Sequence, residues 1–249
     1  MHNYTKTISR FYDSVYDKMR TPVDREFYLN EIANANGPVL EVGVGTGRIF
    51  VEALNRGADI YGLDISENML EILREKLPDS DQHRITHADM RDFDLGKKFA
   101  LIIVPFRIFQ HLLTINEQLS ALKCIKNHLE EGGKLIFDVF NPNLKRITEV
   151  VKDRLELTAE YAPGQIVERY LDSVPDNINQ VIDITFTFKW KENGSELSEK
   201  DSFPFRYYFR FELENLVARA GLNLENIYGD FKYGELNNSS NEFVVVSHL

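Results

Sequence analysis

Three glycines, Gly43, Gly45 and Gly47, stand at every second position between an apolar run and a stretch with helical spacing. Glycines between a strand and a helix let a ligand approach the backbone at a helix N-terminus, as in several nucleotide-binding folds. A dinucleotide site carries G-x-G-x-x-G, whereas this loop reads G-x-G-x-G and has an acid, Glu41, two residues before its first glycine. A carboxylate there suits a ligand with a positive charge, such as an amino-acid ammonium or a sulfonium, better than a pyrophosphate.

Two further acids stand at the ends of the next two predicted strands. Asp64 follows Gly43 by 21 residues, where a carboxylate can accept both hydroxyls of a ribose that lacks a 2′-phosphate. Asp89, one strand later, could accept the exocyclic amine of an adenine, and Met90 could cover a face of the base. Taken singly, the loop also fits a tight turn without a ligand, and each acid fits an N-cap or loop position. Together they favour a charged nucleoside ligand over a dinucleotide.

The elements that must hold these residues alternate between strand and helix. Strands are expected at 39–42, 59–64, 84–89, 99–104 and 134–140, and helices at 47–56, 66–77 and 115–129, with Ser66 as an N-cap. A helix over 212–220, ended by Gly221, and strands at 222–229 and 242–249 follow near the end of the chain. This alternation predicts an α/β fold with a doubly wound, seven-stranded, mostly parallel sheet.

The pattern changes after residue 141. The stretch 181–190 alternates strictly, and Asn193–Gly194 beyond it predicts a hairpin turn. We therefore expect an antiparallel β insertion over 146–210 within a domain made of 36–145 and 211–249, preceded by a helical lid over 1–35. The apolar face of the insertion fits either a roof over a substrate pocket or a homodimer contact. That face consists of Ile182, Ile184, Phe186, Phe188 and Trp190.

Four ordered motifs resemble those of class I S-adenosylmethionine-dependent methyltransferases. They read E-V-G-V-G-T-G (41–47), G-L-D-I-S (62–66), A-D-M (88–90) and E-E-G-G-K-L-I-F-D (130–138), and the resemblance covers about 36–140 and 212–249. It implies a Rossmann-like methyltransferase fold with S-adenosylmethionine as the cofactor. It also implies which residues contact the cofactor: the ribose on Asp64, the adenine near Ile65, Asp89 and Met90, and the methionine moiety near Gly43, Gly45 and the end of the fourth strand. Glu41, Gly47 and Pro105 are further candidate cofactor contacts.

The segment V-P-F-R-I-F-Q-H-L-L (104–113) narrows the resemblance. Relatives that methylate amines or DNA bases often carry Asn/Asp-Pro-Pro-aromatic here, so nucleobase methylation is not expected. The segment is more similar to small-molecule methyltransferases, including the amino-sugar N,N-dimethyltransferases. Their opening segment folds over the cofactor and resembles F-Y-D-S-V-Y-D (11–17), which makes Tyr12 and Tyr16 candidate cofactor contacts; both could instead simply pack the N-terminal helix.

The expected reaction is transfer of a methyl group to N or O of a small molecule. Alignment of the two reactants and exclusion of water contribute most of the catalysis of such a transfer. A base is needed only when the nucleophile arrives protonated. His111 is the candidate base and Arg107 the candidate anchor for an anionic substrate. Each has an alternative, because His111 could bond to backbone and Arg107 could pair with a surface carboxylate. The alternative functions are an NAD-dependent oxidoreductase and a non-catalytic binding protein of the same fold.

The charge and composition of the chain limit which kinds of partner and location are expected. The formal net charge of −10, from 29 Lys and Arg against 39 Asp and Glu, argues against binding to nucleic acid. The longest apolar run, 100–106, is too short to span a bilayer, and no signal segment is recognised. A single cysteine, Cys124, fits a core thiol and a cytoplasmic location. No metal is expected, because His83 and His87 flank a predicted strand rather than share a helix face.

Overall fold

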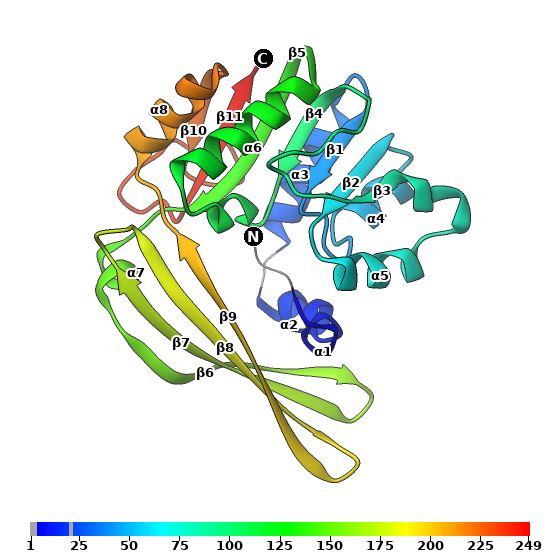
Figure 1. Ribbon diagram of the computed structural model, residues 1–249, viewed down its shortest axis with the longest axis vertical. Coiled ribbons are helices and arrows are strands. Elements are labelled where there is room, and N and C mark those ends of the chain that lie inside the picture. The colour runs from blue at the N-terminus through cyan, green and yellow to red at the C-terminus, as the bar shows by residue number, and fades with distance from the viewer. Residues whose placement is uncertain (1–3, 20–21) are drawn as a thin grey trace.

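A computed structural model describes residues 4–19 and 22–249, which form two sheets and their helices (Figure 1). The larger sheet has seven strands in the order β10-β11-β5-β4-β1-β2-β3. Strand β11 runs antiparallel to β5 and β10, whereas the other neighbouring pairs are parallel. The predicted seven-stranded, mostly parallel sheet is confirmed. Its strands are β1 (Val39–Val42), β2 (Ile60–Asp64), β3 (Ile85–His87), β4 (Phe99–Val104), β5 (Leu129–Phe140), β10 (Asn223–Tyr228) and β11 (Glu242–His248).

Helices cover both faces of this sheet. On one face lie α6 (Ile115–His128) and α8 (Arg210–Ala220), and on the other α3 (Val23–Ala33), α4 (Phe50–Asn55) and α5 (Glu67–Lys76). Side chains of β4 alternate between the two layers, so that Ile102 packs on the first and Ile103 on the second. The central strand β4 is therefore apolar throughout, as expected of a strand buried on both faces.

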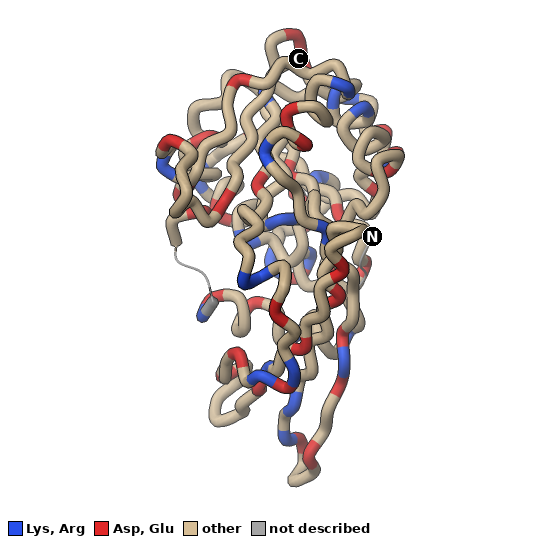
Figure 2. The backbone as a smooth tube through the Cα atoms, turned by 90° about the vertical axis from the view of Figure 1, so that its left-hand side faces the viewer, with Lys and Arg blue, Asp and Glu red and all other residues tan. Residues whose placement is uncertain are grey.

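The second sheet is antiparallel and separate from the first. Its strands, in the order β6-β7-β8-β9, are β6 (Val151–Ala162), β7 (Gln165–Asp176), β8 (Val181–Glu192) and β9 (Ser195–Arg206). Asn193 and Gly194 both have positive φ, 51° and 78°, and form the predicted hairpin turn. The short helix α7 (Leu144–Thr148) leads from β5 into this sheet. Figure 2 shows acidic and basic residues interspersed along both sheets.

The first two helices connect the sheets. Helices α1 (Lys6–Ser9) and α2 (Tyr12–Met19) lie between the second sheet and α5 in Figure 1. Phe11 is fully buried against Phe188 and Trp190 of β8. On the other side, Asp13 accepts a hydrogen bond from Thr46 Oγ1 at 2.5 Å and pairs with Lys76 Nζ at 2.6 Å. The opening segment is thereby attached both to the second sheet and to the glycine loop.

Some local predictions need correction. The helix expected from residue 47 begins at Phe50, because Gly47 has a φ of 87° and remains in the turn. The strand expected over 84–89 spans only β3, since the residues before it form a 3₁₀ helix, η1 (Asp79–Arg84). Ser66 stands at the N-cap of α5, but its side chain makes no capping bond; its backbone N–H bonds to Asp64 instead. None of the described helices is long and apolar enough to cross a membrane.

Candidate active site

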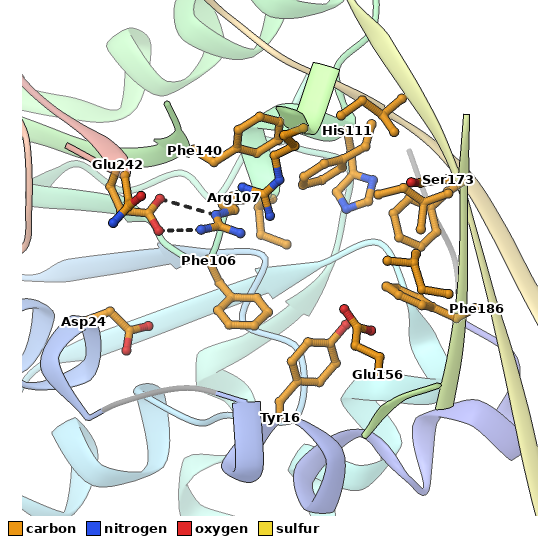
Figure 3. A pocket seen from close by; sticks show the side chains of 18 of the residues that line it. Tyr16, Asp24, Phe106, Arg107, His111, Phe140, Glu156, Ser173, Phe186 and Glu242 are labelled. Carbon is orange, nitrogen blue, oxygen red and sulfur yellow. Dashed lines mark hydrogen bonds and ion pairs between the residues drawn. The ribbon is translucent and has the colours of Figure 1, made fainter. Parts of the chain in front are cut away.

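A cavity of about 970 Å³ lies where the carboxyl ends of β1 and β4 meet the second sheet. The strand order of the large sheet reverses between these two strands, which is where open α/β sheets bind their ligands. One end of the cavity is lined by the glycine loop and the opening helices. The other end is lined by α7, by β6 to β9 and by the loop between β10 and β11. Between the two ends stands the segment that follows β4 (Figure 3).

The glycine loop leaves open space at the cavity. Gly43 and Gly45 line the cavity with φ of 77° and 54°, which only glycine adopts without strain. A Cβ at Gly43 would lie 2.7 Å from Cγ1 of Ile108, whereas a Cβ at Gly45 would meet nothing within 4 Å. Gly45 therefore presents bare backbone to the cavity. Gly47 is buried and faces α5, where a Cβ would lie 2.4 Å from Cδ1 of Leu73.

Asp64 lines the same end of the cavity. Its Oδ2 accepts the Gly45 N–H at 2.9 Å, and its Oδ1 accepts the Ser66 N–H at 2.8 Å. Burial raises the pKa of Asp64, and these backbone bonds act in the opposite direction. Each carboxylate oxygen has a second lone pair, so Asp64 can still accept two bonds from a ligand. Ile65 follows, with its carbonyl oxygen 2.8 Å from Nε2 of His87.

Glu41 is buried beneath the loop, on β1 between Gly62 of β2 and Ile103 of β4. Burial raises the pKa of Glu41 to about 8, although nearby Arg48 acts to lower it. No described residue donates to its Oε2. An orphaned buried acceptor calls for a partner, and a cationic group of a ligand at the glycine loop would supply one. The residues at this end therefore fit a positively charged nucleoside.

The turn after β4 has an unusual backbone. Phe106 and Arg107 both have a φ of 63°, which is costly for residues with a Cβ. Their N–H groups donate to the wholly buried carboxylate of Asp138, at 2.8 Å to Oδ1 and 3.1 Å to Oδ2. The hydroxyl of Tyr28, on α3, donates to the same Oδ1 at 2.6 Å. Asp138 thus fixes the turn, and Pro105 before it is buried.

Sequence reasoning missed Asp138. The residue stands in β5 within the apolar segment L-I-F-D-V-F, and an acid in the middle of a buried strand was the available signal. An acid at such a position is almost never fully buried unless it is paired. The donors that pair with it come from the next layer and the next strand, so they could not be named from the sequence.

Arg107 and His111 both line the cavity beyond this turn (Figure 3). The guanidinium of Arg107 forms a two-bond pair with Glu242 at the start of β11. His111 ends the 3₁₀ helix η2 (Ile108–His111), and its ring lies 5.2 Å from that of Phe203 and 5.0 Å from that of Phe205. Arg107 is therefore already neutralised, whereas His111 stands among aromatic rings of β9.

Tyr12 and Tyr16 of α2 also line the cavity. Their ring centroids are 4.3 Å apart, and the Tyr16 ring meets Phe106 edge-on at 5.1 Å. The opening helix therefore contacts the turn after β4 as well as the glycine loop. Along β8, Ile184 and Phe186 face the cavity as well.

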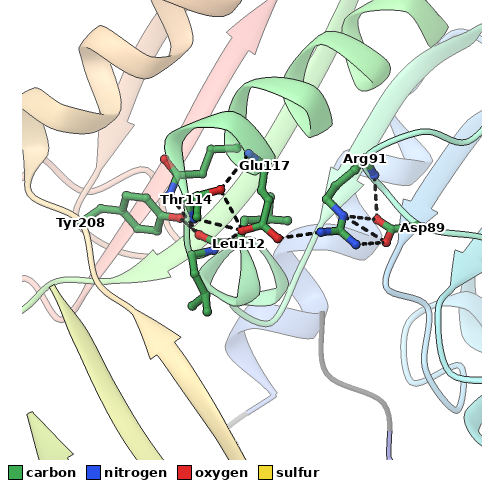
Figure 4. A network of polar contacts seen from close by, with 8 residues as sticks. Asp89, Arg91, Leu112, Thr114, Glu117 and Tyr208 are labelled. Atoms are coloured by element: carbon green, nitrogen blue, oxygen red, sulfur yellow. Dashed lines mark hydrogen bonds and ion pairs between the residues drawn. The ribbon is translucent and has the colours of Figure 1, made fainter. Parts of the chain in front are cut away.

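Asp89 and Met90 are not among the residues that line the cavity. Met90 is fully buried in the main core. Burial acts to raise the pKa of Asp89, but bonds from Arg91 outweigh it and hold the pKa below its usual range. Arg91 donates at 2.6 Å to Asp89 and at 2.6 Å to Glu117 of α6 (Figure 4). Their contact with an adenine stays a prediction.

A polar network holds η2 in place. The buried Tyr208 hydroxyl donates to the carbonyl oxygen of Leu112 at 3.1 Å, and Glu117 accepts the N–H of Thr114 at 3.0 Å (Figure 4). Arg206 donates to the carbonyl oxygen of Leu113 at 3.2 Å. Arg206 and Tyr208 therefore pack the loop after His111. In the described ranges no three His, Cys, Asp or Glu side chains gather where they could hold a metal ion.

Comparisons with known proteins agree with this geometry. Residues 39–133 match a family described as a methyltransferase domain. The chain is 36% identical over 192 residues to a dTDP-3-amino-3,4,6-trideoxy-alpha-D-glucopyranose N,N-dimethyltransferase from Streptomyces venezuelae, with 77% of each chain covered. It is 28% identical over 238 residues to a dTDP-3-amino-3,6-dideoxy-alpha-D-glucopyranose N,N-dimethyltransferase from Streptomyces fradiae, covering 91% and 88%. The fold resembles that of an S-adenosylmethionine-dependent methyltransferase from Clostridium acetobutylicum, with a TM-score of 0.78, 17% identity and 98% of each chain covered.

The substitution Asp138→Asn tests the anchor of the turn. An amide offers one acceptor oxygen and turns N–H groups toward one of the backbone donors, so a buried N–H loses its partner. We expect the free energy of unfolding to fall by about 2–4 kcal/mol. Urea denaturation measures the change, and Asp183→Asn, at an exposed position of β8, should change it by less than about 0.5 kcal/mol. Equal losses in the two variants would contradict the anchoring role.

The substitution Glu41→Gln tests the buried acid. Its pKa is about 8 in the folded chain and 4.5 as a free side chain, so the folded state keeps a proton that the unfolded state loses between these values. The free energy of unfolding of the cofactor-free protein should therefore fall as pH rises from 4.5 to 8, by up to about 1.4 kcal/mol per pH unit from this group. The variant lacks this slope and gains relative stability with pH.

Urea denaturation between pH 5 and pH 8 measures the difference between the wild type and the Glu41→Gln variant. Glu71→Gln, at an exposed position of α5, serves as the control and should follow the wild type at every pH. Parallel pH profiles of the wild type and Glu41→Gln would show that Glu41 ionises normally.

Proposed function

The chain belongs to the S-adenosylmethionine-dependent methyltransferases, and we propose that its acceptor is the amine of a sugar linked to a nucleoside diphosphate. The protein transfers a methyl group to a small molecule. The observation that carries the finer proposal is a single cavity that is lined both by the glycine loop and by the β6–β9 sheet. The two Streptomyces relatives, whose names specify amino sugars carried on dTDP, support this acceptor class.

The cofactor end of the cavity is assigned to the glycine loop and the residues around it. We assign the ribose to Asp64, the ammonium of the methionine moiety to Glu41, and the approach of the ligand to Gly43, Gly45 and the turn at Gly47. Tyr12 and Tyr16 of the opening helix α2 line this end of the cavity. Ile65, Asp89, Met90 and Pro105 remain the predicted contacts around the adenine and the sulfonium. When bound, S-adenosylmethionine supplies an electrophilic methyl group on sulfur.

The acceptor end is suited to an amine nucleophile. An alkyl amine has a pKa of about 10 and arrives protonated at neutral pH, so a proton must leave nitrogen before its lone pair can attack. His111 is proposed to take this proton on a ring nitrogen. The aromatic rings of Phe106, Phe203 and Phe205 limit water around it.

The outer part of the cavity is suited to an anion. Lys145, Arg146, Arg154 and Lys232 line it, although the chain as a whole carries a net charge of −10. Cations that line a cavity, here from α7, β6 and the loop between β10 and β11, are what a diphosphate would require. We assign the diphosphate to these residues, of which Lys145 also pairs with Glu149, and keep Arg107, which pairs with Glu242, as a candidate that orients the sugar.

Cofactor binding is tested by ligand-induced stabilisation. S-adenosylhomocysteine should raise the Tm of the protein, whereas NAD should not. In Asp64→Ala the Kd for S-adenosylhomocysteine should rise at least about 100-fold, because two charge-assisted hydrogen bonds of roughly 1.5–3 kcal/mol each are lost. Calorimetry measures the Kd. Asp79→Ala, exposed and outside the cavity, is the control and should bind as the wild type does. Unchanged affinity in Asp64→Ala would refute the ribose assignment.

Turnover tests the acceptor. With S-adenosylmethionine and dTDP-3-amino-3,4,6-trideoxy-α-D-glucopyranose, mass spectrometry should show addition of one and then two methyl groups. His111→Asn should lower kcat by about 10²–10⁴-fold if its ring removes the proton, with the affinity for S-adenosylhomocysteine unchanged. His83→Asn, at an exposed position of η1, is the matched control. Full activity of His111→Asn would rule out the base, and an unmodified sugar would rule out this acceptor.

A further inference from the structure

Strand β6 carries a β-bulge at Glu156, a residue with no role in the site described so far. Leu155 is paired with Tyr170 of β7, and Leu157 is paired with Arg169, so Glu156 is an extra residue between two regular pairs. Bulges of this kind change the direction of a side chain and are frequent beside active sites.

The bulge reverses which side chains of β6 face inward. Before it, the even-numbered Arg154 and Glu156 line the cavity. After it, the odd-numbered Leu157 and Ala159 pack against the opening helices. A regular strand would alternate without interruption and could not direct both Glu156 and Leu157 to the same face. The bulge therefore lets Glu156 face the cavity while the next residue, Leu157, packs on the same side of the sheet.

Arg169 holds this carboxylate from one side. The arginine is only 1% exposed, and both its Nη2, at 2.7 Å, and its Nε, at 3.0 Å, bind the same oxygen, Oε2 of Glu156. No described residue donates to the other oxygen, Oε1, and the Glu156 side chain is 22% exposed at the cavity wall. One oxygen is thus fixed by the protein, and the other can accept a bond from a ligand.

The stability of the fold does not explain this pair. Burying an arginine with a carboxylate is expensive, and apolar residues of similar volume often stabilise a protein as well or better. The pair does place the negatively charged carboxylate of Glu156 at the cavity wall in a fixed direction. Because Arg169 is nearly inaccessible and binds one oxygen twice, it keeps the Glu156 carboxylate in one orientation.

The surroundings of Glu156 select a cation. Its carboxylate points toward a space bordered by Tyr16, Phe106 and Phe186, with His111 on the far side (Figure 3). A carboxylate oxygen among aromatic faces suits an ammonium group through a charge-assisted hydrogen bond and contacts with the rings. A hydroxyl could donate to the same oxygen, but such a bond has only one charged partner and is weaker.

We propose that Glu156 determines the specificity of the enzyme for an amine over a hydroxyl acceptor, and that Arg169 is the residue that positions it. This inference rests on the proposed amine acceptor. Glu156 attracts the ammonium form and, once a proton has left, accepts an N–H of the neutral amine, which directs the lone pair away from Glu156. A primary amine and its monomethyl product both retain an N–H for this bond. The second transfer gives a dimethylammonium group, which has a single N–H for this bond and none once that proton has left.

The test compares two probes on two proteins in the presence of S-adenosylhomocysteine. The probes are dTDP-3-amino-3,4,6-trideoxy-α-D-glucopyranose and its counterpart with a hydroxyl in place of the amine, and calorimetry gives each Kd. The wild type should bind the amine about 10- to 100-fold more tightly, as expected of one hydrogen bond between charged groups. Glu156→Gln, which keeps the size and removes the charge, should bind the two probes about equally, with the Kd for S-adenosylhomocysteine unchanged.

Two further variants complete the test. Glu160→Gln lies on the same strand, is exposed and is outside the cavity, and should keep the full preference for the amine. Arg169→Met replaces the guanidinium with an apolar chain and should raise KM for the amine sugar with little change in kcat. If Glu156→Gln keeps the preference, or loses affinity for both probes alike, the inference is wrong while the amine acceptor stands. If the wild type binds neither probe, the proposed acceptor is wrong and this inference falls with it.

Discussion

The buried carboxylate of Asp138 is the interaction on which the acceptor half of the cavity depends. Phe106 and Arg107 adopt left-handed backbone conformations, each costing about 1–3 kcal/mol, and their amides are retained by this single side chain. The bond from Tyr28 fixes Asp138 against α3, so the geometry of the turn is determined by the core of the large sheet. Everything after the turn, including η2 with His111, therefore begins from a rigid point.

A second constraint is that the cavity is assembled from segments far apart in the chain. The opening helices contribute Tyr12 and Tyr16, and the large sheet contributes the glycine loop and the turn after β4. The second sheet contributes Glu156 and the aromatic residues Phe186, Phe203 and Phe205. Phe11 and Asp13, one turned to the second sheet and the other to the glycine loop, connect these parts. A small displacement of α2 would therefore alter both ends of the cavity together.

Much of the fold could be predicted from the sequence because its signals are local. The apolar runs of β1, β2, β4 and β5 and the strict alternation of β8 reflect burial on two faces or one, and Asn193–Gly194 specifies its own turn. Gly43, Gly45 and Asp64 could be placed together for a related reason, since their spacing is fixed by one strand–helix–strand unit, and all three line the cavity. Asp138 and Glu156 escaped prediction because their roles arise from tertiary burial and from a bulge that breaks the alternation of β6.

The buried acids of this chain differ in how far the protein itself satisfies them, and this difference separates structure from ligand binding. Asp138 receives three donors from the chain, is fully enclosed and serves the fold. Asp64 receives two backbone donors, keeps free lone pairs and borders the cavity. Glu41 has an oxygen with no described donor, and burial raises its pKa. A carboxylate that the chain leaves partly unsatisfied is destabilising in isolation, so a ligand that supplies a donor would offset this cost at Asp64 in the cavity and at Glu41 beneath the glycine loop. Glu156, with one oxygen held and the other open, follows the same logic at the acceptor end.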